Sequence, residues 1–159
     1  DSCCLYFGPG GLVDCLMTVR HCWRLTVRDE FSAGHALRHY QGKCERLHGH
    51  NFGVELCVEG RDLTPGTELL LDFKVLKTAL KDALRELDHC VLNDTPPFDR
   101  INPSSENLSR HIWRNVAARL AESPDPQARA VRLVSVSVSE KGSQSATYLE
   151  WAEGDPPVR

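Results

Sequence analysis

The chain has 159 residues, 41% hydrophobic and 26% charged, which is the composition of one ordinary globular domain. A net charge of -3 without a run of Lys or Arg argues against nucleic-acid binding and favours a small-molecule partner. Seven Cys without a Cys-x-x-Cys pair, and no apolar run of membrane-spanning length, predict a cytoplasmic protein without a disulfide framework.

The first residues differ in character from the rest of the chain. Residues 1–16 contain Gly8-Pro9-Gly10-Gly11 and no clear hydrophobic period, so we interpret them as an N-terminal extension of unknown role. Met17 is the only Met, and we expect residues 17–159 to form a single domain.

Two strands are predicted on either side of a turn-rich connection. Alternating apolar residues from Trp23 to Val27 predict a half-buried strand that leads to His35, and the same alternation recurs from Phe52 to Val58. We expect these runs to pair as antiparallel neighbours. Such a pair would bring His35 close to the residues that precede Phe52.

Two amphipathic helices are predicted next. Asp72 is a candidate N-cap for the first helix, whose apolar stripe is Phe73, Leu76, Leu80, Leu84 and Leu87. The second is expected to begin near Asn102, with Pro103 in its first turn, and to end at residues 123–126. Its stripe is Leu108, Ile112, Val116 and Leu120.

The last elements are again strands. Valines at 134, 136 and 138 alternate with serines at 135, 137 and 139, and a further strand is expected from Ala146 to Trp151. The order of elements predicts an α+β domain, a four-stranded antiparallel sheet with two helices packed on one face.

The densest cluster of metal-ligand types is Cys44-Glu45-Arg46-Leu47-His48-Gly49-His50. On an extended backbone His48 and His50 point to the same side, and His35 could supply a third nitrogen ligand. Three His with an open fourth position are typical of a catalytic zinc. Taken singly, each of these His could also be an ordinary surface or hydrogen-bonded side chain.

Several motifs in order resemble one family: Phe31-Ser32-Ala33-Gly34-His35, Cys44 before His48-Gly49-His50, Leu87-Asp88-His89, the stretch 102–107 and Glu140. Together they resemble the 6-pyruvoyl-tetrahydropterin synthase family. The three-residue gap after Cys44 resembles its bacterial branch, the 6-carboxy-tetrahydropterin synthases of queuosine biosynthesis. Gly34, Cys90 and Ser105 depart from residues that are more frequent in the family.

The resemblance implies a T-fold, or tunnelling fold, whose sheet edges join around a symmetric barrel. It implies a homo-oligomer, a hexamer built as a dimer of trimers, with active sites at subunit interfaces. The serine-bearing strand face would then look toward the barrel. It also implies that His35, His48 and His50 hold Zn²⁺.

The resemblance further implies that Cys44, Asp88 and His89 are catalytic and move protons. Each also has a simpler interpretation. Cys44 could be a small buried hydrophobe. His89 could be a residue near a helix C-terminus that interacts with the helix dipole, with Asp88 solvated.

Glu140 would be the substrate anchor in such an enzyme. A carboxylate can accept the ring N–H and the exocyclic amine of a pterin together. Ser105 and Glu106 are candidates for the same pocket. Glu140 could instead mark the point where a strand reaches water, and the other two could be ordinary residues of a helix N-terminus.

Our first functional hypothesis is conversion of 7,8-dihydroneopterin triphosphate to 6-carboxy-5,6,7,8-tetrahydropterin, with release of triphosphate and acetaldehyde. One alternative is 6-pyruvoyl-tetrahydropterin synthesis, without carbon–carbon cleavage. Another is a non-enzymatic zinc- or pterin-binding oligomer, against which the presence of Cys44 argues. A third alternative, a zinc hydrolase, would need a general base beside a metal-bound water. Glu45 is the only acid in the central motif, and the resemblance gives it no such role.

Overall fold

Two long antiparallel strands form the centre of the sheet. In the computed structural model, which describes residues 21–152, β1 (Trp23–His35) pairs with β2 (His48–Gly60) over its whole length. The register places His35 directly opposite His48. This confirms the predicted pair, and it follows from alternation, because a one-residue slip would turn every apolar side chain to the other face.

Within residues 21–152 the sheet has five strands in the order β3-β1-β2-β4-β5, one more than the four antiparallel strands that were predicted. β4 (Arg132–Lys141) and β5 (Gln144–Tyr148) extend the antiparallel ladder, whereas β3 (Cys90–Val91) runs parallel to β1. A two-residue strand has no alternation that sequence could reveal. The last strand also ends earlier than the predicted Trp151.

Helix α1 (Phe73–Leu84) begins where predicted, because the Asp72 side chain accepts a hydrogen bond from the Lys74 N–H at 2.8 Å. The predicted stripe is buried at Leu76, Leu80, Leu84 and Leu87. Phe73 does not belong to it, since its side chain is 48% exposed. As the first helical residue, it lies at the border of the packed face.

Helix α2 (Ser105–Ala121) begins later than predicted, with Ser104 as its N-cap, and its whole predicted stripe is buried. A short helix, α3 (Pro126–Ala130), was missed where we expected only a break. Asp125 caps it and Pro126 occupies its first turn, both standard start signals. Within residues 21–152, no helix combines the length and apolar character needed to cross a membrane.

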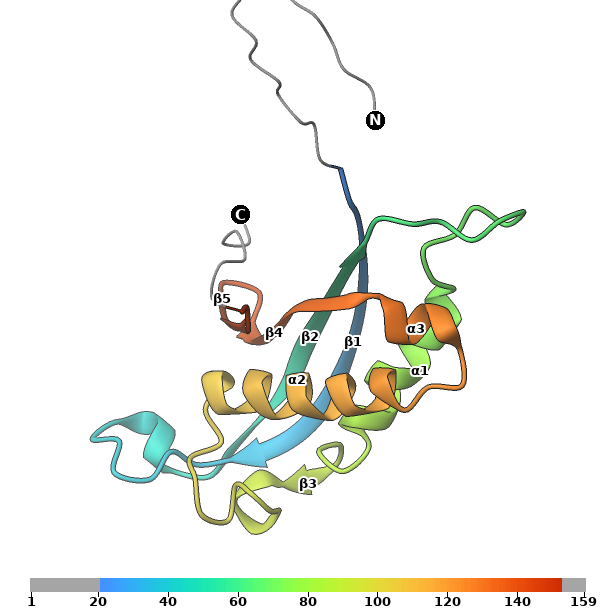
Figure 1. The fold of residues 1–159 in the computed structure, drawn as a ribbon. Coiled ribbons are helices and arrows are strands. Elements are labelled where there is room, and N and C mark those ends of the chain that lie inside the picture. The colour runs from blue at the N-terminus through green and yellow to red at the C-terminus, as the bar shows by residue number, and fades with distance from the viewer. Residues whose placement is uncertain (1–20, 153–159) are drawn as a thin grey trace, which may run out of the picture.

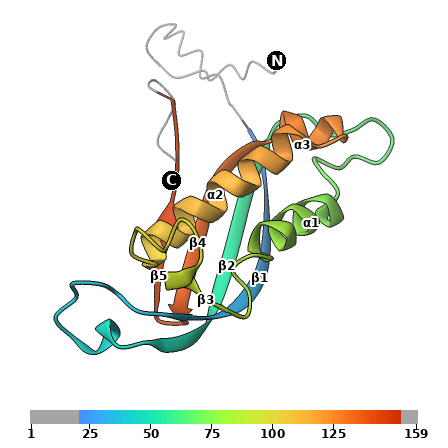
Figure 2. The ribbon, with the colours of Figure 1, turned by 90° about the horizontal axis from the view of Figure 1, so that it is seen from below.

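The helices lie together on one face of the sheet, as Figures 1 and 2 show from two directions. Between them and the sheet lies the core, which includes Phe52, Leu56 and Val136. The serines of β4 lie on the opposite, uncovered face. The proposed extension at residues 1–16 lies outside the described residues, and the single domain at 17–159 stays a prediction.

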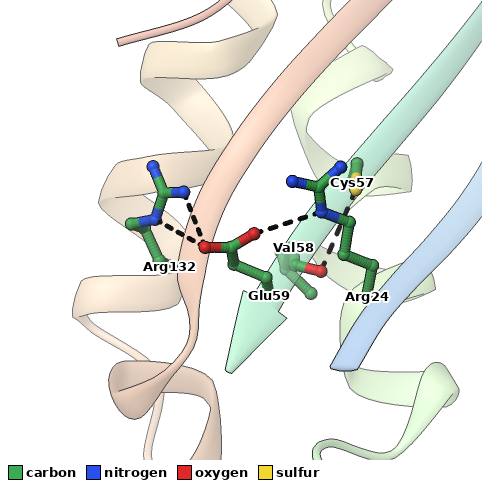
Figure 3. A network of polar contacts seen from close by, with 5 residues as sticks. All are labelled: Arg24, Cys57, Val58, Glu59 and Arg132. Atoms are coloured by element: carbon green, nitrogen blue, oxygen red, sulfur yellow. Dashed lines mark hydrogen bonds and ion pairs between the residues drawn. The ribbon is translucent and has the colours of Figure 1, made fainter. Parts of the chain in front are cut away.

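A network of charged side chains joins β1, β2 and β4 near the C-terminal end of β2 (Figure 3). The Glu59 carboxylate accepts hydrogen bonds from Arg24 at 3.1 Å and from Arg132 at 2.6 and 3.1 Å. Burial raises the pKa of Glu59, but the hydrogen bonds from Arg132 and Arg24 together outweigh it, so its pKa lies below the ordinary value.

Glu59→Gln is expected to lower the free energy of unfolding by about 2 kcal/mol at neutral pH. Because the folded pKa lies below the unfolded value near 4.5, the ionised carboxylate stabilises the fold above that value. This contribution is lost as the pH falls through the folded pKa. Urea unfolding at neutral pH and at about pH 3 should show the difference between the proteins shrinking in acid.

Glu55→Gln is the matched control, because Glu55 pairs with Arg28 where both side chains are exposed. Its loss should change stability by no more than about 0.5 kcal/mol. A difference for Glu59→Gln that is the same at both pH values would contradict the electrostatic explanation.

Candidate active site

The three predicted metal ligands meet on the helix-covered face, at the sheet end where the β1–β2 connection projects beyond the strands (Figures 1 and 2). His35 ends β1, its partner His48 begins β2, and His50 follows on the same face. Their ring centroids are 4.6 to 5.3 Å apart. One ligand atom from each ring lies within 4.8 Å of the others, so this group could hold a metal ion.

Main-chain carbonyls orient two of the rings. His35 Nδ1 lies 2.8 Å from the Pro103 carbonyl oxygen, and His48 Nδ1 lies 2.7 Å from that of Arg46. A carbonyl only accepts, so each Nδ1 carries the proton and each Nε2 keeps its lone pair for a ligand. Within residues 21–152, the Nε2 atoms of His35 and His50 are buried and have no hydrogen-bond partner, as metal-binding nitrogens would be.

Electrostatics favour the neutral form of the third ring. Burial lowers the pKa of His50, and the nearby His35 and His48 lower it further, whereas the Glu140 carboxylate acts in the opposite direction. The net shift is downward. Neutral imidazole is the form that binds metal ions.

A cavity of about 650 Å³ opens beside His50. It is lined by Ser32, Ala33, Gly34, Gly49, His50, Asn51, His89, Cys90 and Glu140. The cavity thus brings together one predicted ligand, one predicted proton carrier and the predicted substrate anchor. Of its lining, Ser32 and Asn51 were not assigned from sequence, because neither residue type stands out locally; their side chains hydrogen-bond at 2.8 Å.

Asp88 and His89 contact each other, because α1 ends at Leu84 and the chain turns before them. Asp88 Oδ1 lies 2.8 Å from His89 Nδ1 and accepts the Ser32 N–H at 2.9 Å. Donation from Ser32, and then from His89, lowers the pKa of Asp88. Asp88 is therefore hydrogen-bonded to the protein, although its catalytic role stays a prediction.

Glu140 is held on both of its oxygens. The Ser105 hydroxyl donates to Oε1 and the Gln144 amide donates to Oε2, each at 3.2 Å. The predicted neighbour Ser105 is therefore present. Gln144 was missed, because only the hairpin between β4 and β5 brings it there. Glu106 is exposed, and within residues 21–152 its side chain makes no hydrogen bond to this group.

Cys44 lies apart from this cavity. It is half-buried in the short helix η1 (Lys43–Glu45), where its carbonyl accepts the Leu37 N–H at 2.8 Å. In the described part of the chain, its thiol neither lines the cavity with His89 nor joins the histidine group. Its role as a proton carrier stays a prediction.

Known proteins resemble this chain over nearly all of the described region. Residues 24–150 match the family described as 6-pyruvoyl tetrahydropterin synthase. The chain is 36% identical over 131 residues to 6-carboxy-5,6,7,8-tetrahydropterin synthase of Synechocystis sp., a match that covers 80% of this chain and 93% of that protein. It is 32% identical over 128 residues to dihydroneopterin monophosphate aldolase of Pyrococcus furiosus, with 80% and 97% covered.

Solved structures share the arrangement of strands and helices. The 6-pyruvoyl tetrahydropterin synthase of Caenorhabditis elegans superimposes with a TM-score of 0.69 at 23% identity, covering 85% of this chain and all of that one. This likeness confirms the predicted T-fold. With the family match over residues 24–150 and the similarity to the Synechocystis protein, it establishes that the chain belongs to the 6-pyruvoyl tetrahydropterin synthase family.

Proposed function

We propose that this protein converts 7,8-dihydroneopterin triphosphate to 6-carboxy-5,6,7,8-tetrahydropterin, with release of triphosphate and acetaldehyde, on the pathway to queuosine. We choose this reaction because the chain is 36% identical to the 6-carboxy-5,6,7,8-tetrahydropterin synthase of Synechocystis. The shared cavity of His50, His89 and Glu140 supports a lyase, because it joins a metal-ligand group, a proton carrier and an anchor.

Glu140 would fix the pterin ring. Glu140 lines the cavity, and hydrogen bonds from Ser105 and Gln144 hold its two oxygens. Each carboxylate oxygen has further acceptor capacity, so a ring N–H and an exocyclic amine can both be bound. Glu106 is a weaker candidate for this pocket, because its side chain is exposed and makes no contact with Glu140.

His89 would move the proton. Its ring lines the cavity, and its Nδ1 faces Asp88, so Nε2 is left to take a proton from the substrate or return it. Asp88 sets the orientation of the ring through its contact with Nδ1. The Ser32 N–H keeps Asp88 ionised for that task.

The metal in this proposal is zinc, held by His35, His48 and His50. The donor set fits, because the group found within residues 21–152 consists of three imidazoles, and three protein ligands with an open fourth position are typical of catalytic zinc sites. When bound, zinc would polarise the substrate's side-chain hydroxyls and make their protons easier to remove.

We further propose a homo-oligomer, a hexamer by analogy with the family, with active sites between chains. Two features support it: the serine-bearing face of β4 is not covered by the helices, and Cys44 lies outside the cavity of its own chain. Sedimentation should show an oligomer. A monomer that still turns over substrate would contradict this proposal.

A cytoplasmic location fits the same function. Cys22, Cys44, Cys57 and Cys90 are unpaired, as thiols are in a reducing compartment. Cell fractionation tests this, and recovery of the protein outside the cytoplasmic fraction would contradict it.

The decisive experiment is a product analysis. Zinc-loaded protein is incubated with dihydroneopterin triphosphate, and the products are identified by mass, with chelator-treated protein as the control. 6-Carboxytetrahydropterin with acetaldehyde supports the proposal, whereas 6-pyruvoyltetrahydropterin supports the reaction for which the family is named. Binding without turnover would leave a non-enzymatic pterin-binding oligomer. Dihydroneopterin monophosphate is the further substrate to offer, since the Pyrococcus relative is named as its aldolase.

A further inference from the structure

The three residues after His35 are each fixed by a different part of the chain. The Asn93 side chain both accepts from the Ala36 N–H, at 2.8 Å, and donates to the Ala36 carbonyl, at 2.9 Å. Asn102 does the same for Arg38, at 2.7 and 2.9 Å. Between them, the Leu37 N–H donates to the Cys44 carbonyl. The backbone that leaves the metal-ligand group is therefore held in one place.

The side chain of Arg38 reaches back into the segment that holds it. Its guanidinium donates to four main-chain carbonyls, those of Asn93, Phe98, Asp99 and Ile101, at 2.8 to 3.2 Å. Arg presents five N–H donors in a rigid planar fork that suits several fixed acceptors, whereas Lys has only three rotatable donors on one nitrogen. Arg38 thereby holds the backbone of residues 93–101 in a fixed position.

The segment 93–101 leads directly to Pro103, whose carbonyl contacts the predicted metal ligand His35. Pro103 follows Asn102 directly, and its carbonyl accepts the Nδ1–H of His35, whose side chain is only 1% exposed. Asn107 of α2 also donates to the Asn102 carbonyl at 2.9 Å, which ties this turn to the helix start. The backbone at Asn102 and Pro103 is thus held by Arg38 on one side and by Asn107 of α2 on the other.

We propose that Arg38, with Asn93 and Asn102, is a positioning residue for the metal site: it fixes the Pro103 carbonyl and so the tautomer and direction of the His35 ring. This inference rests on the metal-binding part of the proposed function. Outer contacts of this kind commonly change metal affinity by about 10- to 100-fold, because they orient the ligand and raise its basicity.

Arg119→Ala is the matched control for Arg38→Ala. Arg119 also donates to main-chain carbonyls, those of Asn115 and Asp82 at 3.1 and 3.0 Å, but these belong to α2 and α1 and not to the segment 93–103 that leads to His35. Both changes should lower the melting temperature of the metal-free protein. Only Arg38→Ala should weaken zinc affinity, by about 10-fold or more in competition with a chelator.

Two further measurements separate positioning from folding. The visible spectrum of Co²⁺ bound in place of zinc reports ligand geometry, and it should change in Arg38→Ala and stay unchanged in Arg119→Ala. Arg38→Lys keeps the charge but not the fork, so its zinc affinity should lie between those of the wild type and Arg38→Ala. This variant also serves if Arg38→Ala does not fold.

The inference is overturned if the Arg38 variants bind zinc as tightly as the wild type, or if Arg119→Ala loses affinity to the same degree. A wild type that binds no zinc would remove both this inference and the zinc site. A wild type that binds zinc but forms no pterin product would remove only the proposed reaction.

Discussion

His48→Ala is expected to lose most of its zinc, while the wild type carries about one ion per chain. The substitution leaves two nitrogen donors, too few to retain zinc through purification. Turnover should fall in parallel. Metal analysis of the protein after gel filtration measures the zinc content directly.

The fold should survive this change, because His48 lies at a strand end and the hydrogen bond that its ring makes within residues 21–152 is to the neighbouring Arg46 carbonyl. The melting temperature in the presence of chelator should therefore stay close to that of the wild type. His39→Ala is the control: His39 lies in the same connection, is exposed and is not part of the ligand group. Full zinc occupancy in His48→Ala would remove His48 from the site.

The grouping of the histidines could be predicted because it depends on local rules. Alternation fixes which side chains share a face, and the turn-rich connection at residues 36–47 allows the chain to return as an antiparallel partner of β1. His35 and His48 then become direct partners. The N-cap at Asp72 could be found for a similar reason, since its partner Lys74 lies two residues away.

Features that depend on distant segments could not be predicted from the pattern. β3 exists because Cys90 lies beside Ala33 of β1, and two residues leave no period. The start of α2 was placed too early, because Asn102 and Ser104 are equally good capping residues by type. In the structure Ser104 is the N-cap of α2, whereas the Asn102 side chain hydrogen-bonds to the backbone of Arg38.

In the candidate site, too, contacts between distant segments could not be predicted from local patterns. Ser105 and Glu140 are 35 residues apart, and their contact was inferred from a resemblance instead of a spacing. Pro103 was not predicted as a site residue, because it contributes a main-chain carbonyl, which every residue type has. Sequence also could not place Cys44 relative to His89, since nothing local fixes the direction of the connection that carries it.

Cys44→Ala is expected to lower turnover by roughly 10²-fold or more, the usual scale for losing a positioned acid or base. Zinc content and pterin affinity should be kept, because the proposed ligands are the three histidines and the proposed anchor is Glu140. Steady-state kinetics, metal analysis and equilibrium binding of a pterin measure the three quantities separately.

Cys57→Ala is the matched control. Cys57 is also a half-buried free thiol, but it lies on β2 near the Glu59 network, and burial raises its pKa. Cys57 does not line the cavity, and its raised pKa makes the thiolate less available as a base, so this variant should keep wild-type turnover.

Cys44→Ser sharpens the test, because the hydroxyl nearly keeps the size of the thiol but ionises far less readily at neutral pH. A loss of turnover as large as in Cys44→Ala would mean that the ionisable sulfur matters and not the space that it fills. If Cys44→Ala lost zinc together with activity, the sulfur would be a ligand supplied from outside the histidine group. If it kept full activity, Cys44 would only pack in the β1–β2 connection, and His89 would have to move the proton without it.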